Sequence, residues 1–248
     1  MVLALGACDA RPPPAAPRGE AVSVNAAEYL SPPEPRTIEG RADGAILAGI
    51  APAGSRVRLA TPQGEALFDD ADTKGAWRIA LGPLPQPRVF GLSVTHKGRQ
   101  AQAQGYVLVE PGGRAALLRA GAAAARIDRP ATGFGLRAVD FDREGAAVVS
   151  AMAAAPGAAV GLWVDDRRVA DGRASASGEV ELAVPTPLTR GLHRLQVYSD
   201  GRSDAVAVQI SSPAPLVQGP LHSQLTPAGL RADWMTPGGG MQSTILIH

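Results

Sequence analysis

Several residue types are scarce in this chain of 248 residues. Cys8 is the single cysteine, so the fold cannot depend on an internal disulfide. Aromatic residues make up only 4% of the sequence, and the cores must therefore be filled by valine, leucine, isoleucine and alanine. Lys74 and Lys97 are the only lysines, which leaves arginine as the main cation.

Long apolar runs and an excess of one charge are also missing. No stretch of roughly eighteen or more apolar residues occurs, which excludes a transmembrane helix. Basic and acidic residues number 24 and 23, and the net charge is +1. The arginines are scattered between acidic residues, whereas phosphate binding needs clustered positive charge. We therefore expect no nucleic-acid partner.

Motifs that would indicate an enzyme or a bound cofactor are absent as well. The sequence has no G-x-S-x-G elbow, P-loop, dinucleotide-binding glycine fingerprint or H-E-x-x-H motif. The four histidines, His96, His193, His222 and His248, lack the spacing of a zinc site. These absences predict a non-enzymatic protein with no metal and no cofactor.

Two acidic clusters could oppose that expectation. Residues 69–75 resemble the start of a calcium loop, but Lys74 occupies a ligand position and Leu81 stands where a closing glutamate belongs. A solvated hairpin is the favoured interpretation. Asp140 and Asp142 fall on one face of an alternating stretch, where a carboxylate pair for acid–base work competes with simple solvation at a strand edge. We favour solvation.

An internal repeat is the most specific feature of the sequence. A shift of 103 positions, from Gly54 to Gly157, superimposes about fifty residues without a gap. The matches fall at turns and at alternating apolar positions: Val57 and Val160, Leu59 and Leu162, Gly75 and Gly178, Ile79 and Leu182, Leu92 and Leu195, Val94 and Val197, Gly98-Arg99 and Gly201-Arg202. The length and the repeat together predict two related domains.

Within each copy the pattern is that of short strands joined by tight turns. Residues 77–81 and 180–184 alternate apolar with other side chains, as half-buried strands do. Each follows a turn that ends in glycine, Gly75 in one copy and Gly178 in the other, which indicates a positive φ. Regularly spaced strands of this kind predict an all-β fold built of sandwiches.

The same residues resemble the bacterial Ig-like modules of cell-surface proteins. The shared pattern is A-x-P-G-A-x-V-x-L-x, then a polar hairpin and A-x-x-x-G-x-W; residues 155–158 carry its first part and residues 71–77 its last. Ala53 in one copy and Val180 in the other depart from it. The resemblance covers about sixty per cent of the chain and implies a fold without a reaction.

These observations divide the chain into six segments. We expect two tandem Ig-like β-sandwich domains at residues 37–112 and 134–212. Alanine-rich residues 113–133 form the linker between them, as a short helix or an irregular strand. Residues 9–36 are expected to be a proline-rich linker at a flexible N-terminus, and residues 213–248 a flexible C-terminal tail with a possible β-strand.

Residues 1–8 resemble the end of a lipoprotein signal. Leu5-Gly6-Ala7-Cys8 is similar to the bacterial lipobox, which implies cleavage before Cys8, acylation of its thiol and a lipid anchor in the cell envelope. The apolar stretch before it is shorter than a secretory leader requires. A start upstream of Met1 and a chance run of small residues are the alternatives.

Two surfaces are candidates for binding a partner. Strand alternation directs Trp163 and Tyr198 outward; if both lie on one sheet they form an aromatic patch able to bind a glycan, and the alternative is simple packing under a loop. The β-prone end, Ser243, Thr244, Ile245, Leu246 and Ile247, could dock on a sheet edge of this chain or of an envelope protein. We therefore expect a lipid-anchored envelope scaffold, with a polysaccharide- or peptidoglycan-binding module as the alternative.

Overall fold

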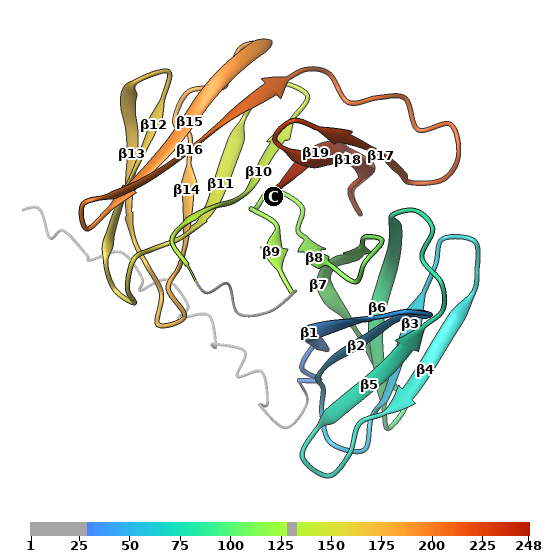
Figure 1. Cartoon of the computed structure of the whole chain (residues 1–248). Helices are drawn as coiled ribbons and strands as arrows, with labels where there is room; N and C mark the ends of the chain where they lie inside the picture. Colours follow the sequence, from blue (N-terminus) through green and yellow to red (C-terminus); the bar gives the residue numbers. More distant parts are fainter. Residues whose placement is uncertain (1–28, 128–132) are drawn as a thin grey trace, which may run out of the picture.

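The computed structural model describes residues 29–127 and 133–248 (Figure 1). Every regular element of these residues is a β-strand, and the strands form four antiparallel sheets. Within the same residues, no helix has the length and apolar character needed to cross a membrane. The all-β class predicted from the sequence is confirmed.

The first β-sandwich, which has seven strands, is called module 1. Strands β1, β2 and β5 form sheet A, and β4, β3, β6 and β7 lie side by side in sheet B. The bounds are β1 Glu34–Arg41, β2 Gly44–Ile50, β3 Arg56–Ala60, β4 Ala66–Asp70, β5 Ala76–Leu81, β6 Arg88–His96 and β7 Arg99–Val109. Leu47, Trp77 and Leu92 belong to the buried core between the sheets. Valine, leucine and alanine supply most of the remaining core, as the composition requires.

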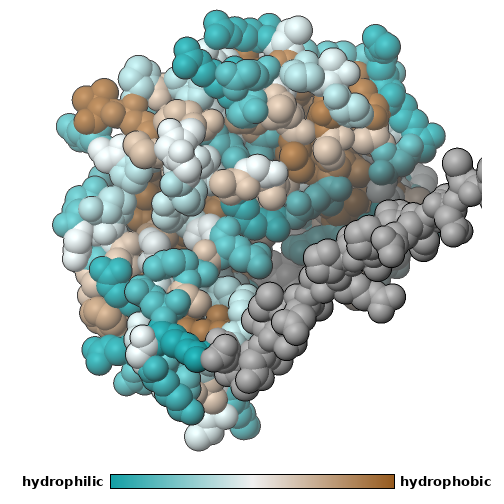
Figure 2. Space-filling view, turned by 180° about the vertical axis from the view of Figure 1, so that it is seen from behind, coloured by the Kyte–Doolittle hydropathy of each residue, from teal (hydrophilic) through white to brown (hydrophobic). Residues whose placement is uncertain are grey.

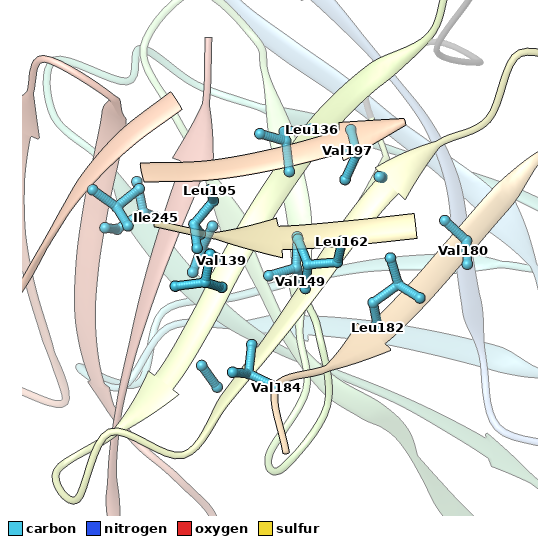
Figure 3. Packing of buried hydrophobic residues seen from close by; sticks show 14 of the residues in the cluster. Leu136, Val139, Val149, Leu162, Val180, Leu182, Val184, Leu195, Val197 and Ile245 are labelled. Atoms are coloured by element: carbon cyan, nitrogen blue, oxygen red, sulfur yellow. The ribbon is translucent and has the colours of Figure 1, made fainter. Parts of the chain in front are cut away.

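Module 2 repeats this sandwich. Strands β10, β11 and β14 belong to sheet C and face sheet D, in which the order is β13-β12-β15-β16. The bounds are β10 Gly135–Asp142, β11 Ala147–Met152, β12 Ala159–Val164, β13 Arg167–Arg173, β14 Glu179–Ala183, β15 Gly191–Ser199 and β16 Arg202–Ile210. Figure 3 shows the apolar side chains of both sheets pointing into the space between them, among them Val149, Leu162 and Val197.

The repeat seen in the sequence is a repeat of strands. β6 begins at Arg88 and its counterpart β15 at Gly191, a separation of 103 positions that β7 and β16 share. The two turn glycines also correspond, with φ of 83° at Gly75 and 88° at Gly178. The tandem β-sandwich prediction is confirmed.

Five further strands lie outside the repeat, in segments for which a linker and a tail were expected. They are β8 Ala115–Leu118, β9 Ala125–Arg126, β17 Leu221–Thr226, β18 Gly229–Met235 and β19 Met241–Ile247. β8 pairs with β7 and carries β9, so that sheet B gains two strands. β19 pairs with β10, and β18 and β17 continue sheet C outward.

The alanine-rich segment forms strands and not the helix that was one of its two expected forms. Ala115 packs in the core of module 1, while Ala116 and Leu118 face the opposite side of the sheet and are also buried. This period of two is that of a strand covered on both faces. A Cβ added at Gly105 would overlap the carbonyl oxygen of Leu118, so the close approach of the two strands requires glycine there. Packing thus overrides alanine's helix propensity.

The C-terminal residues form a three-stranded meander and not a flexible tail. The glycine run is the turn of the β18–β19 hairpin, in which Thr236 N–H donates to Gly240 O over 2.8 Å and Gly239 N–H donates to Thr236 O over 2.9 Å. Ile245 points from β19 into the core of module 2 (Figure 3). A flexible tail was expected because glycines that close a hairpin look like a linker in the sequence.

A third core joins the two modules. Its buried residues come from β7, β8 and the loop after β8 on one side and from β10, β18 and β19 on the other. These residues are Leu108, Ala116, Leu118, Ala124, Ala138, Leu230, Ala232, Trp234 and Leu246. The Trp234 ring is 1% exposed and meets the Tyr106 ring edge-on, with centroids 6.0 Å apart. Part of sheet B therefore packs against part of sheet C.

Sheet C is consequently covered on both faces along its central strands. In β10, Val139 and Phe141 point into the core of module 2, whereas Ala138 points into the third core. Sheet D, in contrast, has one face in solvent, and more exposed residues alternate with more buried ones along β15 and β16, as expected for a half-covered sheet. Figure 2 shows hydrophilic surface predominating on the back of the molecule, with apolar residues in separate small areas.

Candidate functional site

The outer face of sheet D carries the aromatic pair singled out in the sequence. β12 and β15 are neighbours, and their register places Gly161 opposite Tyr198 and Trp163 opposite Gln196. Opposite residues of an antiparallel pair share a face, so both rings lie on one side of the sheet. Leu162 occupies the other side and is fully buried. The expected patch exists as an arrangement of side chains.

The two rings touch and are held in place by the strand beneath them. Their centroids are 4.6 Å apart and their planes meet at 62°. Tyr198 is 40% exposed, while Trp163 is half-buried. A Cβ at Gly161 would approach Cζ3 of Trp163 to 2.5 Å, so glycine at this position is what lets the indole lie along the sheet.

A chain of polar contacts extends the aromatic pair along β15. Gln196 Nε2 donates to the Tyr198 hydroxyl over 2.7 Å, and Arg194 Nη1 donates to Gln196 Oε1 over 2.6 Å. The same guanidinium contacts Asp166 Oδ1 at 2.9 Å. Each exposed contact contributes little stability by itself. Together the contacts orient three long side chains in a row.

The turn between β12 and β13 fixes the end of that row. Asp165 and Asp166 adopt left-handed conformations, with φ of 49° and 64°. Asp165 accepts from the Arg194 backbone N–H over 2.9 Å and pairs with His193 Nδ1 at 2.7 Å. These two hydrogen bonds, the backbone one first, lower the pKa of Asp165. The carboxylate is therefore an anchor for the turn at neutral pH.

On its other side, the aromatic pair is bordered by a cation and by small residues. The Arg168 guanidinium lies 5.3 Å from the centroid of Trp163 and pairs with Asp171. β16 presents Ser203 and Ala205 beside the taller β15 side chains, opposite Tyr198 and Gln196. The surface thus combines ring faces with carboxamide, guanidinium and hydroxyl groups. Such a set can pack against C–H groups and hydrogen-bond to hydroxyls or peptide groups.

Comparison with known proteins adds little to this description. No family model matches the chain, and no curated protein does. Among solved structures the chain is similar to the BSP domain of a biofilm-associated protein, with 13% identity, a TM-score of 0.27, and coverage of 75% of this chain and 30% of that one. It therefore spans less than a third of that structure's length.

A second solved structure is similar at the same low level. It is the central fibronectin-III array of RIM-binding protein, with 11% identity, a TM-score of 0.27, and coverage of 88% of this chain and 86% of that one. Similarity this weak says nothing about what the chain binds.

The expectation that Asp140 is solvated at a strand edge is wrong, because Asp140 is buried where the modules meet. It is 2% exposed. Its carboxylate accepts from Thr244 Oγ1 over 2.5 Å, Gln242 Nε2 over 3.1 Å and the Ala124 backbone N–H over 2.8 Å. Burial raises the pKa of Asp140 to about 6, against the opposing effect of these hydrogen bonds. The carboxylate therefore belongs to the contact between the modules.

Gln242 extends this contact to the loop after β8. Its Nε2 also contacts the carbonyl oxygen of Arg119 at 3.1 Å, and its Oε1 accepts from Gly121 N–H over 3.0 Å. Arg119 in turn pairs with Glu181 of sheet C. Module 1 and module 2 are thus joined by buried hydrogen bonds as well as by the third core. We call Asp140, Gln242 and Thr244 the polar latch.

The remaining acidic residues have local roles. Asp142 Oδ1 accepts from the backbone N–H groups of Glu144 and Ala146 and so caps the turn that follows β10. Asp72 does the same with Lys74 and Ala76, and those backbone hydrogen bonds, that from Ala76 first, lower its pKa. Among residues 29–127 and 133–248, no group of three potential metal ligands occurs.

The other predicted site residues fall into two groups. Ser243 to Ile247 form part of β19, which pairs with β10 on one side and β18 on the other. Of the two docking alternatives, the structure shows pairing within this chain. Because β19 lies between two strands of its sheet, it has no free edge for a partner. Cys8 lies outside the described residues.

The third core and the polar latch were not anticipated from the sequence. In sequence, β18 alternates Leu230, Ala232 and Trp234 with Arg231 and Asp233, which is the pattern of a strand with one face in solvent, whereas the structure buries six consecutive positions from Gly229. A strand covered on both sides usually has a continuous apolar run, and β18 lacks one. Arg231 and Asp233 suggested an exposed face because of their charges. They instead form a buried pair at 2.9 Å.

Proposed function

We propose that this chain is a non-enzymatic cell-envelope lipoprotein that acts as a spacer and protein-interaction scaffold. The observation that carries the proposal is the third core. It holds two β-sandwiches in one orientation, whereas tandem domains joined by a linker alone reorient freely. A fixed orientation suits a protein that must keep a binding surface at a defined place.

The lipid anchor is the part of the proposal that rests on Cys8. Acylation at that residue would attach module 1 to a membrane through the proline-rich residues 9–28, which favour an extended spacer. Module 2, and with it the outer face of sheet D, would then be the part farther along the chain from the anchor.

Intact mass and membrane fractionation test this arrangement. The chain is expressed in a bacterial host from the longest in-frame upstream start, beside a Cys8→Ser variant. We expect a mature protein that begins at a lipid-modified Cys8 and fractionates with membranes, and a soluble Cys8→Ser variant. A parent protein that stays soluble and unmodified would contradict the anchor.

Glycan binding is a second candidate, favoured by the contact between Trp163 and Tyr198. Exposed aromatic rings with neighbouring planar polar groups are suited to the C–H faces and hydroxyls of a sugar. Pull-down with purified peptidoglycan and cell-wall polysaccharide tests it. Phe68→Ala changes an exposed aromatic residue of module 1 and serves as the control. Glycan binding is supported if the parent and Phe68→Ala are retained and Trp163→Ala is not. Equal retention of all three proteins would reject it.

A further inference from the structure

The outer strands of the four sheets differ in how they are protected against pairing with other chains. Edge strands usually carry charged residues, proline or bulges that discourage such pairing. Seven of the outer strands in the described residues have at least one charged side chain: β1, β4, β5, β9, β13, β14 and β16. β17 differs, because its sequence Leu-His-Ser-Gln-Leu-Thr has no Asp, Glu, Lys, Arg or Pro and its register is regular.

The free backbone groups of β17 can be assigned from its pairing with β18. Met235 N–H donates to Pro220 O over 2.9 Å, which makes residues 220 and 235 a hydrogen-bonded pair. Hydrogen-bonded and non-hydrogen-bonded pairs alternate along an antiparallel ladder. The N–H and C=O groups of Leu221, Ser223 and Leu225 therefore point outward. β17 thus offers three donors and three acceptors along its outer edge.

A groove lies beside this edge. It has a volume of about 480 Å³, and Leu221 to Ser223 form one part of its wall. Residues 62–63 and 86–89 of module 1 complete the lining together with Pro215, Val217, Gln218 and Pro220. The unprotected edge therefore faces a space between the two modules and not a flat surface.

The lining is polar but carries little charge. Gln63, Gln86 and Gln218 contribute carboxamides, each of which can donate and accept hydrogen bonds. Arg88 and His222 are the only ionisable residues of the lining, and the Arg88 guanidinium pairs with Glu65. This chemistry favours an uncharged ligand that brings its own hydrogen-bonding backbone.

One exposed apolar side chain lines the groove, and a second lies farther along β17. Val217 is 85% exposed and belongs to the lining, and Leu225 is 75% exposed at the far end of β17. By the strand period of two, Leu225 lies on the same face as Leu221 and Ser223. A ligand strand with apolar residues at alternate positions would cover both.

We infer that the outer edge of β17 and its groove dock an extended, uncharged segment of a partner protein by strand addition. The segment hydrogen-bonds to Leu221, Ser223 and Leu225 and packs alternate apolar side chains against Val217 and Leu225. In this mode, main-chain hydrogen bonds supply affinity and the side-chain contacts supply selectivity. The inference rests on the proposed scaffold role and names the place and the chemical class of its partner.

The test uses a phage-displayed library of linear nonapeptides selected against the full chain. Selected peptides are then titrated against the parent, Ser223→Pro and Ser223→Ala. Proline removes an outward N–H that makes no bond to β18, so the sheet should remain intact, while alanine keeps that N–H. We expect at least about tenfold weaker binding to Ser223→Pro and little change for Ser223→Ala. Thermal unfolding of both variants checks that they are folded.

Amide hydrogen exchange supplies a readout that does not depend on a variant. Bound peptide should slow exchange at Leu221, Ser223 and Leu225 and leave β13 and β16 unchanged. Failure to select any peptide, or binding equal in Ser223→Pro and the parent, would overturn the inference. Peptides that fail to bind Trp163→Ala but still bind Ser223→Pro would also overturn the inference, although the scaffold role would stand. A soluble, unmodified parent in fractionation would remove the envelope role and leave this site intact.

Discussion

The strands of the repeated sandwiches and the strands added to them differ in the cores that they build. Strands β1 to β7 and β10 to β16 are counterparts, and each set supplies most of one module core, to which Ala115 of β8 and Ile245 of β19 are added. Most of the third core between the modules comes from the added strands β8, β18 and β19, with Leu108 of β7 and Ala138 of β10 contributed by the repeated strands. The repeat therefore specifies most of the fold of each module, whereas sequence outside the repeat specifies most of the contact that joins the modules.

The largest difference is expected at Trp234, a residue of the added strands. Trp234→Ala leaves a cavity in the third core and removes the hydrogen bond that Trp234 Nε1 donates to Thr244 over 3.1 Å. Removal of a buried tryptophan costs about 3–5 kcal/mol. Chemical denaturation should show this loss, with the modules unfolding in separate transitions.

Trp163→Ala is the matched control for that variant. Its ring is half-buried on the outer face of sheet D and encloses no core. A loss for Trp234→Ala no greater than that for Trp163→Ala, in a single transition, would show that the third core does not hold the modules together.

The polar latch should give a pH-dependent contribution to stability. Burial raises the pKa of Asp140 to about 6, whereas an unfolded aspartate has a pKa near ~3.9. Between these values the folded state keeps a proton that the unfolded state releases, so raising the pH through this window lowers the free energy of unfolding. The loss is on the order of 3 kcal/mol, complete above the folded pKa.

Asp140→Asn isolates that contribution because its side chain does not titrate. Urea denaturation from pH 4 to 7 should show the parent losing stability relative to the variant as the pH rises. A difference between the two proteins that is constant over this range would contradict the burial of an ionisable group at the latch.

The repeat permits a closer comparison at its two turn glycines. A Cβ at Gly75 would overlap the carbonyl oxygen of Ala51, which is backbone, whereas at Gly178 it would lie 2.9 Å from Met152 Sδ, which a flexible side chain can move. Both have positive φ. Gly75→Ala should therefore cost about 2 kcal/mol and Gly178→Ala about 1 kcal/mol. Equal melting temperatures of the two variants would show that the turns are equivalent.

The smallest effect on stability is expected on the outer face of sheet D. Gln196→Ala breaks the contacts to Tyr198 and Arg194, both at the surface. Exposed contacts of this kind contribute about 1 kcal/mol or less. Thermal unfolding should change by no more than a few degrees. A larger loss would mean that the row of side chains is part of the structural framework and not an available surface.

Sequence reasoning reached the modules because their signals are local. Alternation in residues 77–81 and glycine at Gly75 and Gly178 depend on neighbours along the chain, and the repeat supplied each signal twice. The outward position of Trp163 and Tyr198 follows from the same alternation. Their contact needed the register between β12 and β15, which a single sequence does not contain.

The added strands were misjudged because their structure depends on distant partners. Ala116 and Leu118 favour a helix in isolation but face the third core once β8 pairs with β7. The sequence pattern around Asp140 is that of a solvated carboxylate, because Gln242, which hydrogen-bonds to it, lies about a hundred residues later in the chain. The unprotected edge of β17 could be recognised only after the other sheet edges were known.

The fixed relation between the modules is the central claim, and a distance between them tests it most directly. Phe68 in module 1 and Leu192 in module 2 are exposed, and each can be replaced by a spin-labelled cysteine in a Cys8→Ser background. Pulsed electron paramagnetic resonance then records the distance between the two labels. The account predicts one narrow distance distribution, which Trp234→Ala broadens. A broad distribution in the protein with Trp234 intact would contradict it, because modules that move independently cannot form a rigid scaffold.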